Sequence, residues 1–267
     1  MKSLLKRAMI GSAGLALLSS SAMAAWTFSA ADMVIGFQAT SGTGATTNLF
    51  FNLGDSYDFS TANFTYGFQG NINDDLVDTY GANWANRTDL YFGVIANRSN
   101  LTALGSPAVP GVSDAGRTVY VSAPTIAIGG APLRTSLSNT SLGNGATSYA
   151  GLRTNLTGFS ETGFADGVAS LNQSAQPVQW NNSWTVRNPT PGAGFAVFTG
   201  GIQQQFGAVG TNNIVDIQRM TPSTPSTYVG SLIIGDNGDI TLIPETSTSA
   251  LAAFAGALLA FRRRRNA

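Results

Sequence analysis

Residues 228–243 read Tyr-Val-Gly-Ser-Leu-Ile-Ile-Gly-Asp-Asn-Gly-Asp-Ile-Thr-Leu-Ile, two runs of strand-forming residues around a short polar centre. The centre, Asp236-Asn237-Gly238, contains an Asn-Gly pair, which tolerates the positive φ angles of a type I′ turn. The runs Tyr228–Ile234 and Asp239–Ile243 therefore predict the two strands of an antiparallel hairpin. This hairpin indicates an antiparallel β protein.

Other parts of the chain contain runs of the same kind, separated by segments rich in Gly, Ser, Thr and Asn. They predict strands at Met33–Ala39, Asn48–Leu53, Asn63–Phe68, Asp89–Ala96, Thr118–Ser122, Ile126–Ile128, Gly194–Thr199 and Asn213–Arg219. The first two are expected to be neighbours joined by the loop around Ser41–Gly44, and Thr221–Thr227, with two prolines, predicts a break. Regular strand–helix alternation and a fixed repeat are not evident in the sequence. We therefore expect a mainly β protein with an antiparallel β-sandwich or jelly-roll-like domain.

Helices are expected in two places within this domain. Leu76, Tyr80 and Trp84 are spaced four residues apart, which predicts one short helix near 74–85 with a common apolar face. Asn73 or Asp74 would cap this helix, and Gly81 would weaken its middle by about 1 kcal/mol. Residues 134–176 are rich in Ser, Thr, Asn and Gly, and a structureless loop of that length is improbable in a compact domain. We expect weak helices there.

The N-terminal residues have the composition of a secretory signal peptide. Lys2, Lys6 and Arg7 form a positive region, and an apolar helix-forming segment follows. Ala22-Met23-Ala24 is a small-x-small cleavage site, with Ala22 and Ala24 as the small residues. We therefore assign residues 1–24 to a signal peptide and residues 25–243 to one exported β-rich domain.

Residues 244–267 combine three features in a fixed order. Pro244-Glu245-Thr246 is a short polar motif, and Ala250–Phe261 contains only Ala, Leu, Phe and Gly. The basic residues Arg262, Arg263, Arg264 and Arg265 follow directly. The apolar run is short for a membrane span but has no polar face, and the arginines are expected to stay on the cytoplasmic side. This order predicts a membrane-targeting tail with a hydrophobic helix.

This tail resembles the PEP-CTERM sorting signal of exported bacterial proteins. Pro244 and Glu245 match the family motif, whereas Thr246 stands where a second proline is usual. The resemblance implies processing by an exosortase-type enzyme at the inner membrane and delivery to the cell surface or outside the cell. Further stretches resemble a group of uncharacterised PEP-CTERM proteins, among them 32–37, 52–54, 75–77, 80–85 and 228–232. The resemblance implies no catalytic residues.

Composition excludes several kinds of chemistry. The chain has no His and no Cys, and residues 25–244 have no Lys, so catalytic triads, thiol nucleophiles and Schiff-base lysines are excluded from the exported part. Zinc and copper sites normally need His or Cys ligands. This part contains 7 basic and 13 acidic residues, a formal charge of −6, which disfavours nucleic acid and anionic lipid as partners.

From these observations we expect a non-catalytic protein of the cell surface or extracellular matrix, without a cofactor. A first alternative is a carbohydrate-binding module that contacts extracellular polysaccharide through Trp180 and Trp184, although core packing explains these side chains better. A second alternative is a glycoside hydrolase using Asp and Glu.

Calcium is a further alternative at two acidic segments. Asn71–Asp78 and Asp236–Asp239 each gather oxygen ligands. The N-terminus of a helix explains the first segment better, and a hairpin turn explains the second.

Overall fold

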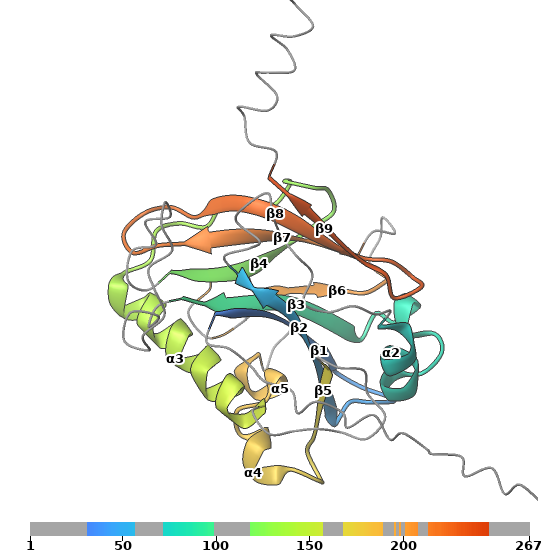
Figure 1. The fold of residues 1–267 in the computed structure, drawn as a ribbon. Helices are drawn as coiled ribbons and strands as arrows, with labels where there is room; N and C mark the ends of the chain where they lie inside the picture. Colours follow the sequence, from blue (N-terminus) through green and yellow to red (C-terminus); the bar gives the residue numbers. More distant parts are fainter. Residues whose placement is uncertain are drawn as a thin grey trace, which may run out of the picture.

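The computed structural model describes residues 31–56, 72–98, 118–156, 168–188, 195, 198, 201–207 and 213–245. In these residues, strands in the order β5-β2-β1-β3-β4-β7-β8-β9 form one curled antiparallel sheet, and β6 pairs with β3 outside this path (Figure 1). The strands are β1 Asp32–Ala39, β2 Thr47–Asp55, β3 Leu90–Asn97, β4 Val119–Thr125, β5 Val168–Asn172, β6 Gln203–Gln205, β7 Asn213–Met220, β8 Thr227–Ile234 and β9 Ile240–Pro244. The helices are α2 Asn73–Tyr80, the 3-10 helix η1 Trp84–Asn86, α3 Asn139–Leu156, α4 Pro177–Trp180 and α5 Trp184–Arg187. The prediction of a mainly β, antiparallel protein is confirmed.

The expected sandwich differs from this arrangement in one respect. A sandwich consists of two sheets packed face to face. The described strands instead share one continuous set of backbone hydrogen bonds, so a jelly-roll arrangement is not confirmed. The core is enclosed by the curl of a single sheet.

Both predicted strand pairs are confirmed. β8 and β9 form a hairpin in which Ile234 lies opposite Ile240, and Gly238 in the turn has a φ of 80°. β1 and β2 are antiparallel neighbours, as expected from the turn-forming residues between them. Local turn chemistry was therefore sufficient to place four of the strands.

Other strand predictions had different outcomes. The strand expected at Ile126–Ile128 is wrong, because Thr125 Oγ1 accepts the N–H of Ala127 at 3.2 Å and turns the chain out of β4. Strands β5 and β6 were not predicted. The strand at Asn63–Phe68 lies outside the described residues, as does most of Gly194–Thr199.

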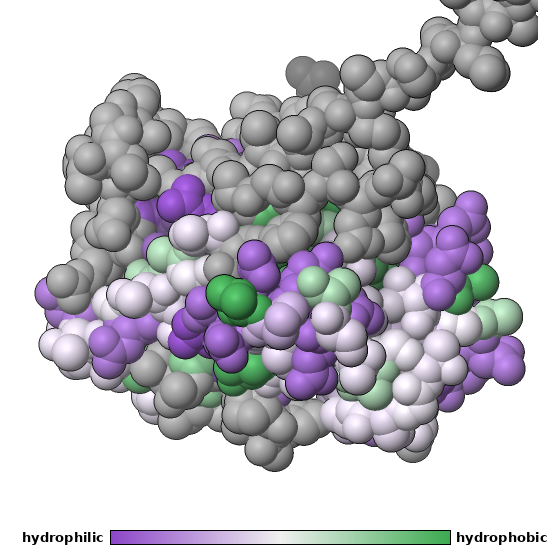
Figure 2. Space-filling model, turned by 90° about the horizontal axis from the view of Figure 1, so that it is seen from below, coloured by the Kyte–Doolittle hydropathy of each residue, from purple (hydrophilic) through white to green (hydrophobic). Residues whose placement is uncertain are grey.

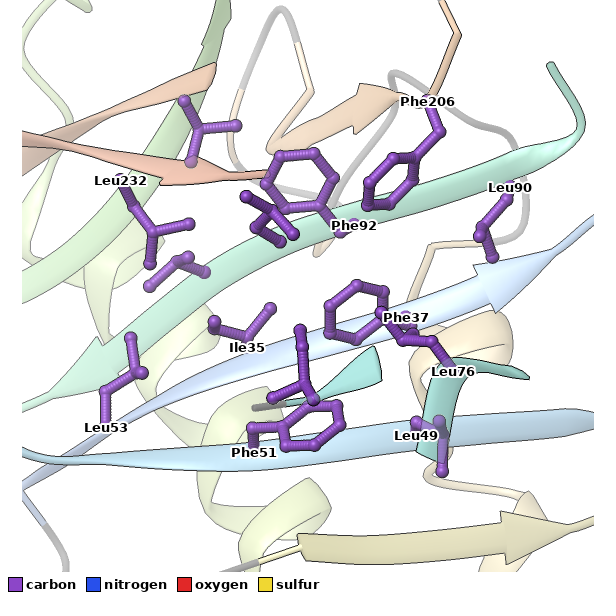
Figure 3. Close-up of a cluster of buried hydrophobic side chains, with 14 of the residues drawn as sticks. Ile35, Phe37, Leu49, Phe51, Leu53, Leu76, Leu90, Phe92, Phe206 and Leu232 are labelled. Atoms are coloured by element: carbon purple, nitrogen blue, oxygen red, sulfur yellow. The ribbon is translucent and has the colours of Figure 1, made fainter. Parts of the chain in front are cut away.

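The inner core lies within the curl of the sheet and consists almost entirely of aliphatic and aromatic side chains (Figure 3). Phe37, Phe51, Phe92 and Phe206 form its centre, with ring centroids of Phe92 and Phe206 4.8 Å apart. Such aromatic pairs add to the stabilisation that comes from burial of their apolar area. The core thus extends across β1, β2 and β3.

Helix α2 packs against this inner core through the three predicted side chains. Leu76, Tyr80 and Trp84 are all buried, although Trp84 belongs to η1 because Gly81, with a φ of 90°, ends α2. Gly81 is therefore a helix terminator, as glycine often is, and not the weak centre of one longer helix. The Tyr80 hydroxyl lies 3.1 Å from Phe37 O and 3.2 Å from Thr47 O, which fixes the helix to β1 and β2.

The opposite, outer face of the sheet is covered by α3, α4 and α5 (Figure 1), together with Phe195, Phe198 and Ile202. Ser138 Oγ accepts the N–H of Ser141 at 3.1 Å and caps α3, which confirms that residues 134–176 contain helix. The buried side of α3 is formed by Leu142, Ala146, Tyr149, Leu152 and Leu156. Seen from below, the described surface has hydrophobic residues only as small spots among hydrophilic ones (Figure 2).

Candidate functional site at the C-terminal edge of the sheet

The predicted sorting motif begins inside the folded sheet. Pro244 is the last residue of β9 and lies opposite Gly230, and the N–H of Glu245 donates to Val229 O at 3.0 Å. Strand β9 is at the edge of the sheet, where proline is tolerated because the ladder does not need its missing N–H. The boundary expected between residues 243 and 244 therefore falls within a strand.

The other residues predicted to act in targeting lie outside the described part of the chain. These are Ala22, Ala24, Thr246, Arg262, Arg263, Arg264 and Arg265, together with the two apolar segments they flank. Among the described helices, none is long and apolar enough to cross a membrane.

A buried carboxylate lies in the sheet near the end of β9, the exit point at which the chain leaves the sheet. Asp216 on β7 lies opposite Ser231 on β8 and is fully buried. Its Oδ1 accepts the Ser231 hydroxyl at 2.6 Å and the Gly129 N–H at 2.9 Å, and its Oδ2 accepts the Ala131 N–H at 2.8 Å. Hydrogen bonds from several donors stabilise a carboxylate away from water. Asp216 thus ties the loop after β4 to the sheet.

Tyr228 connects this loop with the end of β9. Its hydroxyl lies 2.9 Å from Ser231 Oγ, and its ring is near Gly129, where an added Cβ would lie 3.8 Å from it. Burial raises the pKa of Tyr228, and the nearby charges of Asp216 and Glu245 add to the rise. The loop, the buried carboxylate and the exit point of the chain therefore form one structural unit.

Sequence reasoning did not identify this unit. The available signal was Asp216 itself, an acidic residue between the apolar residues Val215 and Ile217. It lies on a strand next to the one that carries Ser231. The contacts that give Asp216 its role come from residues more than 80 positions earlier in the chain. No local pattern specifies them.

The structure places both tryptophans predicted as glycan contacts inside the protein. Trp184 is fully buried, and its indole occupies the space that a Cβ at Gly36 or Gly93 would need, two glycines that face each other across β1 and β3. Trp180 is only 8% exposed. Stacking on a sugar requires an exposed aromatic face, so the carbohydrate interpretation of these residues is corrected in favour of core packing.

The two segments considered for calcium lie next to each other, since the N–H of Ile72 donates to Gly238 O at 3.3 Å. Among the described residues, however, no group of three or more His, Cys, Asp or Glu side chains is arranged to hold a metal ion. Burial and the neighbouring Asp74 and Asp78 raise the pKa of Asp75 to about 6.

Polar side chains of both segments form hydrogen bonds within the protein. The prediction that Asn73 or Asp74 caps α2 is wrong, because α2 begins after Ile72 without a side-chain cap. Asn73 Oδ1 instead accepts the Trp84 indole N–H at 3.1 Å. In the hairpin turn, Asn237 Oδ1 accepts the Asp239 N–H at 3.2 Å. These contacts are those of a helix start and a turn.

No known protein family, curated protein or solved structure matches this chain. No relative therefore supplies an activity or a set of site residues to transfer to it.

Proposed function

We propose that this chain is an exported bacterial protein of the cell surface or extracellular matrix. In this proposal, the signal peptide at residues 1–24 directs export, and the PEP-CTERM-like tail at 244–267 holds the protein at the inner membrane. An exosortase-type enzyme then removes the tail and releases or attaches the β domain. The protein acts as a structural component and not as an enzyme.

The observation that carries this proposal is the direct transition from the sheet to the tail. Backbone pairing continues through Pro244 and Glu245, and the apolar run begins only five residues later at Ala250. Four arginines follow this run, a pattern that favours a cytoplasmic end. The folded domain would therefore be held close to the membrane, with its β8–β9 edge nearest the lipid.

Two observations support the proposed structural role: the residue types missing from the exported part and the burial of the two candidate sugar-binding tryptophans. The exported part has no His, Cys or Lys to serve as a general base, nucleophile or amine. Trp180 and Trp184, which were considered for sugar binding, are buried among the apolar side chains on the outer face of the sheet. The domain is thus proposed as a stable acidic β module delivered by its two targeting segments.

Intact mass of the protein recovered from its native host, combined with cell fractionation, tests the proposal. We expect the exported fraction to contain a chain that begins near Ala25 and lacks Arg262–Arg265. A variant with the four arginines replaced by glutamine should keep its tail and accumulate in the membrane or be misdirected, whereas Arg153→Gln, an arginine in α3, should be processed normally. Full-length protein in the cytosol, with both segments present, would disprove the proposal.

A further inference from the structure

The loop that Asp216 fixes to the sheet carries an unusual surface. Three of the five exposed large hydrophobic residues in the described part of the chain lie within eight positions: Ile126 is 78% exposed, Ile128 51% and Leu133 56%. Residues 118–133 contain no charged side chain. We refer to residues 125–133 as the apolar loop.

The backbone of the apolar loop already has internal hydrogen-bond partners. Thr125 Oγ1 donates to Ala127 O at 2.8 Å, and the Gly130 N–H donates to the same carbonyl at 2.9 Å. Asp216 accepts two further N–H groups of the loop, and Gln218 Nε2 donates to Pro132 O at 2.9 Å. Unsatisfied backbone polar groups make entry into a less polar environment costly, and these bonds reduce that cost by satisfying the N–H groups of Gly129, Gly130 and Ala131 and the carbonyls of Ala127 and Pro132.

The apolar loop also lies where the chain leaves the sheet. A Cβ at Gly129 would lie 3.8 Å from the ring of Tyr228, and the N–H of Glu245 donates to Val229, the residue that follows Tyr228. In Figure 1 the lime-green segment after β4 lies beside the C-terminal end of β9. Five extended residues span at most about 18 Å, so Ala250, where the apolar run of the tail begins, lies within that distance of Glu245.

We propose that the apolar loop is a second membrane contact, which places Ile126 and Ile128 in the headgroup region of the bilayer that holds the tail. This inference rests on the proposed function, since the tail brings the loop to the lipid. The absence of charge in the loop fits a lipid surface, because burial of an unpaired charge there would be costly. Two contacts fix the orientation of the domain, whereas a tail alone would leave it free to rotate.

The absence of cysteine from the chain allows single labelling sites to test this inference. Ile128→Cys reports on the apolar loop and Ala253→Cys on the tail. Val178→Cys in α4 is the matched control, because Val178 is a 74% exposed hydrophobic residue on a different element. Each variant is purified with its tail intact from the membrane of an expressing bacterium, labelled with a polarity-sensitive fluorophore and reconstituted in phosphatidylcholine vesicles with or without a spin-labelled quencher lipid.

We expect the labels at 128 and 253 to shift to shorter wavelength and to lose intensity with the quencher lipid, while the label at 178 does neither. Quenching at 253 without quenching at 128 would overturn this inference and leave the proposed function in place. Absence of quenching at both positions would overturn the proposed function as well. A wavelength shift at 128 without lipid quenching, accompanied by cross-linked dimers, would show that a second copy of the chain covers the loop and would also overturn the inference.

Discussion

The two faces of the sheet are covered in different ways. The inner core is closed mainly by the curl of the sheet and by α2, and the buried serines beside it include Ser122, opposite Ile217, and Ser170, opposite Leu49. The outer face is covered by helices and irregular segments, and its strands carry buried polar residues between the apolar ones. Gln38, Asn48 and Asp216 are examples.

Each of these outer residues binds a segment that crosses the sheet. Gln38 Nε2 donates to Asn188 O at 3.1 Å and to Gln203 Oε1 at 2.9 Å, and Asn48 Oδ1 accepts the Thr185 N–H at 3.1 Å. Irregular segments have backbone groups without partners in regular secondary structure, and burial requires that these groups be satisfied. On the outer face, the buried polar side chains thus supply hydrogen-bond partners to the irregular segments that cover it.

The substitution with the largest expected effect on stability disrupts the packing of the outer face at one glycine. In Gly36→Val the new Cβ would lie 2.2 Å from Trp184 Cε3, so the indole must leave its position. We expect a loss of about 4 kcal/mol in the free energy of unfolding, similar to removal of a large core side chain. Urea denaturation followed by circular dichroism measures this loss.

Gly81→Ala provides the control for this substitution. A Cβ at Gly81 meets no atom within 4 Å, but the φ of 90° strains any other residue. We expect a loss of only about 1–2 kcal/mol. Because the φ of Gly36 is not positive, a loss in Gly36→Val no larger than that in Gly81→Ala would show that Trp184 can move aside without cost.

Removal of the buried carboxylate should have the next largest effect. Asp216→Ala leaves the Gly129 and Ala131 N–H groups without their acceptor, which predicts a loss of about 3 kcal/mol and faster hydrogen exchange in residues 127–131. Asp239→Ala, at an exposed turn, should change stability by less than about 0.5 kcal/mol. Unchanged exchange in the apolar loop would disprove the anchoring role of Asp216.

Two buried tyrosines allow a direct comparison of the faces. Tyr80→Phe on the inner side removes a hydroxyl that also accepts the Leu49 N–H at 3.3 Å, whereas Tyr149→Phe on the outer side removes one bond to Asp32 O at 2.5 Å. We expect losses of about 2 and about 1 kcal/mol, respectively, in thermal unfolding. The reverse order would mean that α3 depends on its hydroxyl more than α2 does.

The smallest expected effect is a gain in stability at the edge of the inner core. The pKa of Asp75 is about 6 in the folded protein, above the value of about 3.9 for an unfolded chain, so the folded state binds the proton more tightly. The contribution of Asp75 to stability therefore increases as the pH falls from about 6 to about 4.

Asp75→Asn tests this pH dependence. Because the variant has no buried carboxylate, we expect it to be about 1 kcal/mol more stable than the parent at pH 7 and to lose the gain between pH 6 and pH 4. Asp78→Asn, at an exposed position of the same helix, removes only one of the charges that raise the pKa of Asp75 and should give a smaller gain over the same pH range. Melting temperatures between pH 4 and pH 8 distinguish the two variants. A gain in Asp75→Asn that persists at pH 4 would mean that a group other than Asp75 causes the pH dependence.

The sequence by itself determined the strand pairs that are local in the chain. Tyr228–Ile234 and Asp239–Ile243 could be paired because Asn237-Gly238 specifies a turn, and the common face of Leu76, Tyr80 and Trp84 follows from helical spacing. In the same way, residues 244–267 could be identified from composition and order. Their role in sorting remains a prediction.

Only the tertiary structure decided which polar residues are buried and what they bind. Alternation along a strand assigns Gln38 or Asp216 to a polar face, and such a face is normally expected to meet solvent. Their partners lie 165 and 87 residues away in the chain, and those distant segments cover the face. Periodicity reports the environment of neighbouring residues, but a buried hydrogen bond between distant segments exists only once the chain has brought them together.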